Sequence, residues 1–316
     1  MSYNLKLLSM AGQGGSAFGV GLLDWIESHE NLRVLSADMS TPAGLDKFKA
    51  AYPYRFYNVG IAEQNMIGVA AGLTDEGYKT ISVAQACFIS MRCFEQVRQY
   101  CGYMRSPQVL VGIGSGVYLQ HMGNTHYALE DIALMRTIPG MQVIAPCDSL
   151  EAVKALEAAI NSSAPCYIRL FGGTNVPAVY KEDYDFEIGK SVKFGEGDTV
   201  QIIATGSMVS VALSVAEKLN SEGISSYVTN MHTVKPLDES SIDLNVKLVV
   251  SMEEHHTIGG LGDAVAGYLA QLANHPRLLK IGISDTFIPV GSYQYILDQC
   301  GLSSDKIKER ILNIIK

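Results

Sequence analysis

The chain has 316 residues, enough for two domains that each bury a core of their own. Hydrophobic residues make up 47% and charged residues 18%, a composition typical of a soluble globular protein rather than a disordered one. The formal net charge of −8 leaves no basic stripe that could follow a nucleic-acid backbone. We therefore expect no nucleic-acid partner.

The cysteines and the N-terminal residues indicate a reducing cytoplasm. Residues 1–19 contain one lysine and a short apolar patch, unlike a signal or transit peptide. No apolar run approaches the roughly 18 residues of a membrane span, so we expect no membrane association. The cysteines lack CxxC spacing and read as buried thiols rather than zinc ligands: Cys87, Cys93, Cys101, Cys147, Cys166 and Cys300.

Apolar runs with strand character recur in the first half of the chain, at residues 31–38, 78–86, 107–113, 141–146 and 165–170. Their unbroken hydrophobicity predicts burial on both faces, as in a parallel sheet covered by helices. Helical stretches alternate with them, at residues 16–29, 94–104 and 149–163. The first half is predicted to be an α/β layer structure.

Residues 172–198 are rich in glycine and charge and lack a helical period, which is typical of a connection between domains. A second α/β series follows. Its strands are predicted at 199–206, 225–231, 247–252 and 278–283, and its helices at 207–223 and 261–273. We predict two domains, residues 1–188 and 189–316.

Two glycine-rich corners invite a phosphate-binding interpretation. Residues 11–19 (AGQGGSAFG) have no following lysine and no clear preceding strand, so they meet neither the P-loop nor the dinucleotide-binding pattern. Residues 204–210 (ATGSMVS) lie at a strand-to-helix turn, where glycine and serine are ordinary helix-start residues. Neither corner predicts a phosphate site.

The stretch RFYNVGIAEQNM (55–66) places a carboxylate, Glu63, where a strand-like run meets a helix-like one. An acid in a first helical turn is favoured by roughly 0.3–1 kcal/mol through the macrodipole, which alone could explain it. Three more motifs follow: LEDIALMRTIPGMQVIAPCD (129–148), NMHTVKPLD (230–238) and SMEEHHTIGGLG (251–262). In this order and spacing, the four motifs resemble the C-terminal half of transketolase, from about Met10 to the end of the chain.

The resemblance implies a pyrimidine-binding α/β domain followed by a transketolase C-terminal-like α/β domain. In this family thiamine diphosphate lies between two chains, and a further domain grips its diphosphate through Mg²⁺. That domain carries a GDG motif, which does not occur in this sequence. The resemblance therefore implies the pyrimidine-binding subunit of a split enzyme, which works with a separate Mg²⁺-holding partner in a heterotetramer of two of each subunit.

Within this resemblance, Glu63 is the candidate catalytic acid. A carboxyl group hydrogen-bonded to the pyrimidine N1′ favours the imino tautomer, whose 4′-nitrogen then removes the proton from thiazolium C2. Such a hydrogen bond is strongest in a dry site. That requirement gives a reason for an acid at a buried strand–helix corner.

Phe88 is implied to stack on the aminopyrimidine, contributing on the order of 0.5–1.5 kcal/mol beyond area burial. Gln85 and Met91 fall where transketolases often carry aromatics; Gln85 either hydrogen-bonds the ring or satisfies neighbouring backbone. Arg92 either pairs with a carboxylate, approaches the substrate or lies on the surface. All four belong to the run QACFISMR (85–92).

Ile61 and Met39 match family positions where bulky apolar side chains shape the bent cofactor. Core packing would explain either residue equally well. Asp38, at the end of its predicted strand, is expected to support the cofactor rim.

His126 aligns with the family histidine that contacts the hydroxyls or carbonyl of a ketose donor, a role that suits an imidazole near neutral pH. A purely structural histidine is the alternative. His121 lies close enough in sequence to participate, and Arg169 in YIRLFGG is kept as a substrate-binding arginine.

Several phosphate- and donor-binding positions of the family are replaced. The aspartate four residues before the donor histidine is Met122, and an earlier loop histidine is Gly114. A phosphate-binding arginine is Gly15 and a phosphate-binding serine is Pro42. We predict transfer of a two-carbon ketol or acyl unit on a non-standard or non-phosphorylated sugar or oxo substrate.

Other interpretations stay open. The β subunit of a 2-oxoacid dehydrogenase E1 component has the same two domains and glutamate, and a non-catalytic assembly subunit would keep the fold without activity. Deoxyxylulose-phosphate synthase is a third relative, usually a single chain. The EEHH run (253–256) suggests a metal, but adjacent side chains on a strand point to opposite faces, so we predict no metal site in this chain.

Overall fold

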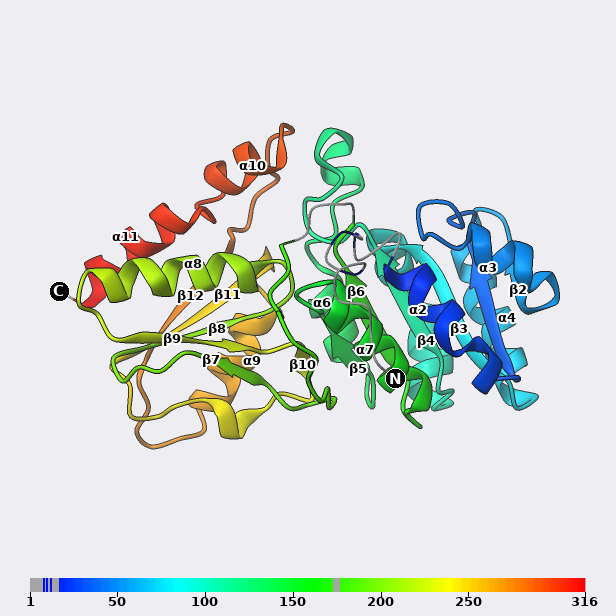
Figure 1. Ribbon diagram of the computed structural model, residues 1–316, viewed down its shortest axis with the longest axis horizontal. Helices are drawn as coiled ribbons and strands as arrows, with labels where there is room; N and C mark the ends of the chain where they lie inside the picture. The colour runs from blue at the N-terminus through cyan, green and yellow to red at the C-terminus, as the bar shows by residue number, and fades with distance from the viewer. Residues whose placement is uncertain (1–7, 9, 11, 13–16, 173–176, 316) are drawn as a thin grey trace.

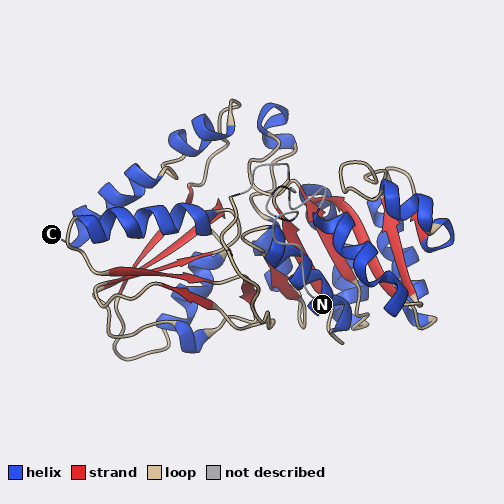
Figure 2. Ribbon diagram, viewed as in Figure 1, coloured by secondary structure: helices blue, strands red, loops and turns tan. Residues whose placement is uncertain are grey.

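The computed structural model describes residues 8, 10, 12, 17–172 and 177–315. These residues form two α/β units, each built around a mostly parallel sheet with helices on both faces (Figures 1 and 2). The predicted fold class is confirmed. Within the described residues, no helix is long and apolar enough to span a bilayer.

The first sheet has seven strands in the order β10-β5-β6-β4-β3-β1-β2. All pair in parallel except β10, which is antiparallel to β5. Central strands are wholly buried, which accounts for their continuous apolar runs. The strands are β1 (Leu32–Ser36), β2 (Phe56–Asn58), β3 (Lys79–Gln85), β4 (Val109–Ile113), β5 (Gln142–Ile144), β6 (Cys166–Leu170) and β10 (Thr233–Lys235).

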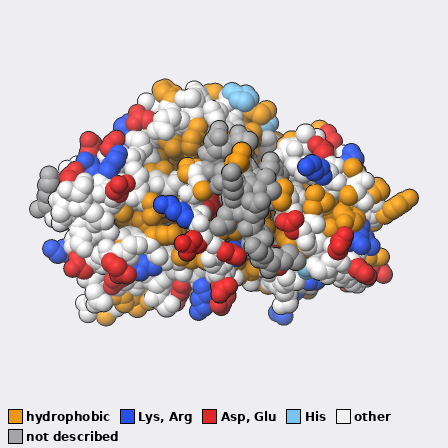
Figure 3. Space-filling model, viewed as in Figure 1, with side chains coloured by type: hydrophobic (Ala, Val, Ile, Leu, Met, Phe, Trp, Pro, Cys, Tyr) orange, Lys and Arg blue, Asp and Glu red, His pale blue; other side chains and the backbone are white. Residues whose placement is uncertain are grey.

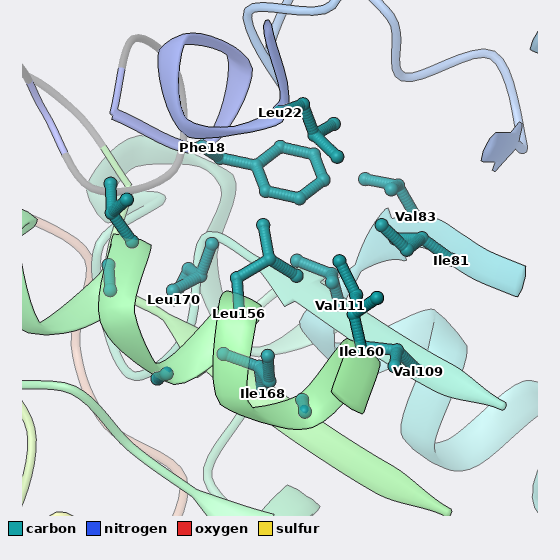
Figure 4. Close-up of a cluster of buried hydrophobic side chains, with 14 of the residues drawn as sticks. Phe18, Leu22, Ile81, Val83, Val109, Val111, Leu156, Ile160, Ile168 and Leu170 are labelled. Atoms are coloured by element: carbon teal, nitrogen blue, oxygen red, sulfur yellow. The ribbon is translucent and has the colours of Figure 1, made fainter. Parts of the chain in front are cut away.

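Two apolar layers cover this sheet. On one face, α2 (Phe18–Trp25) and α7 (Ser149–Asn161) pack through Phe18, Leu22 and Leu156 against strand residues such as Val83 and Val111 (Figure 4). The helix α3 (Asp46–Ala51) joins this layer through its buried phenylalanine, Phe48. On the other face lie α4 (Glu63–Asp75), α5 (Phe94–Val97) and α6 (Asp131–Thr137). Short helical turns complete the unit: η2 (Ile26–Ser28), η3 (Pro53–Arg55), η4 (Phe88–Arg92), η5 (Arg98–Tyr103) and η6 (Gln120–Thr125).

The second sheet has five strands in the order β12-β11-β8-β9-β7. They are β7 (Val192–Phe194), β8 (Val200–Ala204), β9 (Ser226–Asn230), β11 (Leu248–His256) and β12 (Arg277–Ile283), with β7 antiparallel to β9. The accompanying helices are α8 (Met208–Ser221), α9 (Leu261–Leu269), α10 (Tyr293–Gln299) and α11 (Ser304–Ile315), with the turn η7 (Glu239–Ser241). The buried apolar residues of α8, α10 and α11 form one cluster with β8 and β11, whereas those of α9 belong to the cluster that also covers the first sheet.

Two short strands depart from the sequence prediction. The predicted plain connection at residues 172–198 contains β7, which forms the edge of the second sheet. β10 follows β9 in the chain yet joins the first sheet, beside β5. The Lys235 ammonium of β10 also donates to the carbonyl oxygens of Arg136 and Ile138, at 2.8 and 2.6 Å. The first sheet is thus completed by a segment from the second half of the chain.

Candidate functional site

Four neighbouring strands of the first sheet, β2, β1, β3 and β4, run in the same direction. Their carboxyl ends therefore lie along one edge, which is where ligands bind in parallel α/β sheets. The segments that leave this edge carry Asp38 and Met39 after β1, Glu63 after β2, Phe88 after β3 and His126 after β4. The topology gathers predicted site residues from four separate parts of the sequence.

Glu63 is the first residue of α4 and only 3% exposed. Gly60 has φ of 74°, a left-handed conformation that glycine adopts without strain, and it turns the chain from β2 into the helix. Ala62 precedes the helix and offers no side-chain cap, so the acid itself brings negative charge to the helix N-terminus. The buried strand–helix corner predicted for Glu63 is confirmed.

The Glu63 carboxylate is paired with Arg92. Arg92 Nη1 donates to Glu63 Oε1 at 3.0 Å and to Oε2 at 2.9 Å. The Arg92 guanidinium carbon also lies 4.1 Å from the centroid of the Phe88 ring, within cation–π range. The Phe88 and His126 rings form a T-shaped pair, with centroids 5.4 Å apart. Glu63, Arg92, Phe88 and His126 therefore form one continuous chain of contacts.

The π-helical turn η4 presents Phe88 and Arg92 from the same short segment. The hydroxyl of Ser90 stabilises this turn by donating to the carbonyl oxygen of Ala86 at 2.6 Å. Cys93, just after the turn, is buried; burial and then the nearby Glu63 charge raise the pKa of its thiol to about 12. Cys93 is therefore a neutral packing residue beneath the site.

Asn58, which the sequence motifs do not single out, ties the ends of β1 and β2 together. Its Oδ1 accepts from the backbone N–H groups of Asp38 and Gly60, both at 3.0 Å, and its Nδ2 donates to Asp38 Oδ1. Asp38 has φ of 57°, an uncommon conformation for a non-glycine residue that this clasp holds in place. An asparagine that ends a strand just before a glycine turn is the signal that could have indicated it.

Apolar side chains around Glu63 face outward. Ile61 is 76% exposed and Met91 is 41% exposed, while Met39 and Gln85 are half-buried. Within the described part of the chain, the Gln85 amide makes no hydrogen bond, so it is available to a ligand. The space-filling view shows apolar side chains spread over the visible face of both units (Figure 3). The acid lies in a dry setting beside a surface that another molecule could cover.

The loop of residues 114–126 brings His126 to the site and is tied to the second unit. Asn124 Nδ2 donates to the carbonyl oxygen of Ile288 at 2.9 Å, and the Val117 N–H donates to Glu254 Oε1 at 2.7 Å. His126 Nδ1 lies 2.9 Å from Thr125 Oγ1. His121 is exposed and stands outside the chain of contacts from Glu63 to His126.

Arg169 is 3% exposed and held by structural partners. Its Nε donates to Asp131 Oδ2, and its Nη2 donates to the carbonyl oxygens of Ala128 and Glu254. These contacts join the two units and explain why an arginine is kept there. Its predicted role in substrate binding stays a prediction, and the contacts within the chain give the guanidinium a structural role.

Three residues of the EEHH run, Glu253, Glu254 and His255, are buried, and His256 is half-buried. Glu253 accepts from the Leu261 and Gly262 N–H groups and so caps α9, and burial raises the pKa of its carboxyl to about 7. Glu254 accepts from Ser207 Oγ and Tyr293 OH, both at 2.6 Å. No cluster of three or more histidine, cysteine or acidic side chains that could hold a metal occurs among the residues described here.

The replaced family positions have ordinary surroundings. Met122 is 44% exposed and Pro42 is exposed, whereas Gly114 has φ of 72° and serves a turn at the end of β4. Gly15 lies outside the described residues, as does most of the glycine-rich corner 11–19. At the other corner, Ser207 donates to Glu254, which gives that serine an internal partner.

Family models match both parts of the chain. Residues 14–171 match the transketolase pyrimidine-binding domain, and residues 189–307 match the transketolase C-terminal domain. The chain therefore belongs to the transketolase family of thiamine diphosphate-dependent transferases, and it carries that family's pyrimidine-binding and C-terminal domains. The resemblance drawn from the four sequence motifs is confirmed.

Curated relatives of similar length support this assignment. The chain is 37% identical over 300 residues to a putative transketolase C-terminal section of Methanocaldococcus jannaschii, covering 95% of each protein. It is 36% identical to a subunit of 6-deoxy-6-sulfo-D-fructose transketolase from a Clostridium species, covering 90% of this chain and 89% of that one. It is 31% identical to one of the subunits of the apulose-4-phosphate transketolase of Phocaeicola vulgatus, covering 93% and 95%.

Solved structures agree with the fold. A protein described as a split-gene transketolase, inactive beta4 tetramer, superposes with a TM-score of 0.85 at 34% identity, covering 95% of this chain and 97% of that chain. Transketolase from Campylobacter jejuni superposes with a TM-score of 0.79 at 18% identity, and this chain spans 49% of its length. The second similarity supports the fold alone.

Proposed function

We propose that this chain is the pyrimidine-binding subunit of a split transketolase, which transfers a two-carbon ketol or acyl unit only when joined to a separate subunit. The observation that carries the proposal is the buried carboxylate of Glu63, set beside the Phe88 ring at the carboxyl edge of a parallel sheet. We expect the complex to work in the cytoplasm.

The described residues fit the pyrimidine half of thiamine diphosphate. A heterocycle that carries ring nitrogens and an amino group needs a flat apolar face and a carboxyl partner, and Phe88 and Glu63 offer them. The two side chains lie close together, because the Arg92 guanidinium contacts both of them. The Gln85 amide can add a hydrogen bond at the rim. When bound, thiamine diphosphate supplies a carbon nucleophile at its thiazolium ring.

Each side chain has a defined task in this proposal. Glu63 shares a proton between its carboxyl oxygen and the ring nitrogen, and its burial keeps water from competing for that hydrogen bond. Phe88 and Met39 orient the ring. His126 holds Thr125 through Nδ1, which leaves Nε2 to contact a donor hydroxyl or carbonyl.

The exposed apolar surface around Glu63 supports a partner subunit. The exposed side chains of Ile61 and Met91 present apolar surface to water, which is unfavourable. A second protein that covers them would bury this surface and would also exclude water from Glu63. The relatives described as subunits support a separate partner subunit, and the one described as an inactive beta4 tetramer supports self-association of chains of this type. We propose a heterotetramer of two of each subunit, with diphosphate and Mg²⁺ held by the partner.

The replaced positions favour a donor other than an ordinary pentose phosphate. Each charge-assisted phosphate hydrogen bond is worth roughly 1.5–3 kcal/mol, so losing two or three weakens binding by several powers of ten. Two relatives are described as acting on 6-deoxy-6-sulfo-D-fructose and on apulose 4-phosphate, which are not common pentose phosphates. We propose a modified or non-phosphorylated sugar, or a small oxo compound, as the substrate.

The test is co-expression with a candidate diphosphate-binding subunit, in the first place one encoded beside this chain. Calorimetry should show thiamine diphosphate and Mg²⁺ binding to the complex far more tightly than to this chain alone. A donor screen should then find turnover that Glu63→Gln abolishes.

Three outcomes would count against the proposal. A complex that is catalytically inert would favour the assembly subunit, and transfer to a lipoyl-domain acceptor would favour the 2-oxoacid dehydrogenase. Turnover of xylulose 5-phosphate at ordinary transketolase rates would contradict the proposed substrate class.

A further inference from the structure

Arg92 contacts both groups that would recognise the aminopyrimidine. Its Nη1 spans the two carboxylate oxygens of Glu63 at 3.0 and 2.9 Å, and its Cζ lies 4.1 Å from the Phe88 ring centroid. The Arg92 side chain remains 43% exposed, so its outer side is open to solvent. One guanidinium thus satisfies the acid and covers an aromatic face.

The guanidinium has the properties that this recognition requires. It is flat, delocalised and cationic, it carries N–H donors in its plane, and it stacks on aromatic rings. An aminopyrimidine that shares a proton with Glu63 is likewise flat, carries an in-plane N–H next to the carboxylate and stacks on Phe88. The guanidinium and the aminopyrimidine would therefore bind to the same carboxylate and the same aromatic face.

We infer that Arg92 competes with the aminopyrimidine of the cofactor for Glu63 and Phe88, and must swing away before the cofactor is bound productively. The inference rests on the proposed function. A pyrimidine ring cannot lie on the face of Phe88 that Arg92 covers and reach the carboxylate in place of Nη1 while the guanidinium stays where it is.

A reason for such a competitor lies in the burial of Glu63. A carboxylate that is 3% exposed is costly when it has no counter-charge, and Arg92 provides that charge. The exposed side of the guanidinium gives it a route into solvent without disturbing the core. The apparent affinity for the cofactor is then the intrinsic affinity multiplied by the fraction of molecules in which Arg92 has moved away from Glu63 and Phe88.

The experiment measures thiamine diphosphate binding, in the presence of Mg²⁺, to the complex of this chain with its partner subunit. We expect Arg92→Met, which keeps an unbranched, flexible stem but removes the guanidinium, to bind the cofactor about tenfold more tightly than the wild type. Arg92→Lys keeps the charge without the planar fork and should show a smaller gain. Damage to the fold would not produce tighter binding.

Arg98 provides the matched control. It is an exposed arginine six positions later, and it forms no ion pair with any residue in the described part of the chain. Arg98→Met should leave cofactor affinity unchanged. Circular dichroism and thermal melting of every variant establish that the complexes are folded.

The possible results separate the two proposals. If the wild-type complex binds thiamine diphosphate and Arg92→Met binds it equally or more weakly, the competition is refuted while the proposed function stands. If the wild-type complex does not bind thiamine diphosphate at all, the proposed function fails and the competition fails with it.

Discussion

Arg169 of β6 donates from Nε to Asp131 Oδ2 of α6 at 2.8 Å, and the two side chains are 3% and 0% exposed. The hydroxyl of Tyr167 donates to the same Asp131 oxygen at 2.8 Å. Arg169 Nη2 donates to the carbonyl oxygen of Glu254 in β11. A single buried ion pair therefore connects the first sheet, one of its helices and the second sheet.

Asp131→Asn should destabilise the chain strongly. It removes the counter-charge of a guanidinium that cannot reach water, and breaking a buried pair of this kind costs about 3–5 kcal/mol. Denaturant unfolding followed by circular dichroism measures the loss. Glu196→Gln, which disrupts the surface pair with Lys193, is the control and should change the midpoint little. Equal effects of the two substitutions would refute a structural role for the Asp131–Arg169 pair.

Glu253→Gln should alter how stability depends on pH. Burial raises the pKa of this carboxyl from 4.5 in the unfolded chain to about 7 in the folded one, so the folded chain holds the proton more firmly between these values. The stability contributed by protonated Glu253 is present below pH 4.5 and is lost as pH rises through 7. Glutamine does not ionise, and its single side-chain oxygen can replace one of the two carboxylate oxygens that accept from the Leu261 and Gly262 N–H groups.

As pH rises from about 5 to about 8, the free energy of unfolding of the variant should therefore increase relative to that of the wild type, by on the order of 1–3 kcal/mol. Melting temperatures of both proteins across this range provide the measurement. A difference that stays constant with pH would contradict the interpretation.

His126→Ala should impair donor turnover without affecting the cofactor. The His126 ring forms a T-shaped pair with Phe88, and we propose that it contacts a donor oxygen, so we expect kcat/KM of the complex to fall about 100-fold or more. The dissociation constant of thiamine diphosphate should stay the same. His121→Ala is the matched control on the same loop. If both variants lose activity equally, the distinction drawn between the two histidines is wrong.

Ile61→Asp should weaken assembly with the partner subunit. The side chain is 76% exposed beside Glu63, and a partner that covers it would have to bury the new charge unpaired. Analytical ultracentrifugation of the mixed subunits should show dissociation increased at least about tenfold. Leu244→Asp, at an exposed leucine of the second unit, should assemble normally. Unchanged assembly of Ile61→Asp would place the interface elsewhere.

Sequence patterns are sufficient for much of the fold and part of the site. Unbroken apolar runs predict the central parallel strands because burial on both faces leaves no alternation. Resemblance singles out Glu63, Phe88 and His126, and they come together because strand ends of a parallel sheet share one edge. Their roles in the reaction stay predictions.

Other features depend on tertiary contacts that no local pattern reports. The three-residue strands β7 and β10 are too short to show a period. The pairing of Arg169 with Asp131, 38 positions earlier in the chain, requires knowledge of which elements pack together. The sequence allows three roles for Arg92, and its position beside Glu63 and over Phe88 selects the carboxylate partner.

Strand β10 has a practical bearing on how the protein can be divided. β10 satisfies the outer hydrogen-bonding edge of β5, so a fragment that stops before residue 233 would leave that ladder open to association with other molecules. Limited proteolysis within the connection should accordingly yield two pieces that stay together in solution. The N-terminal unit, produced alone, should be prone to aggregation.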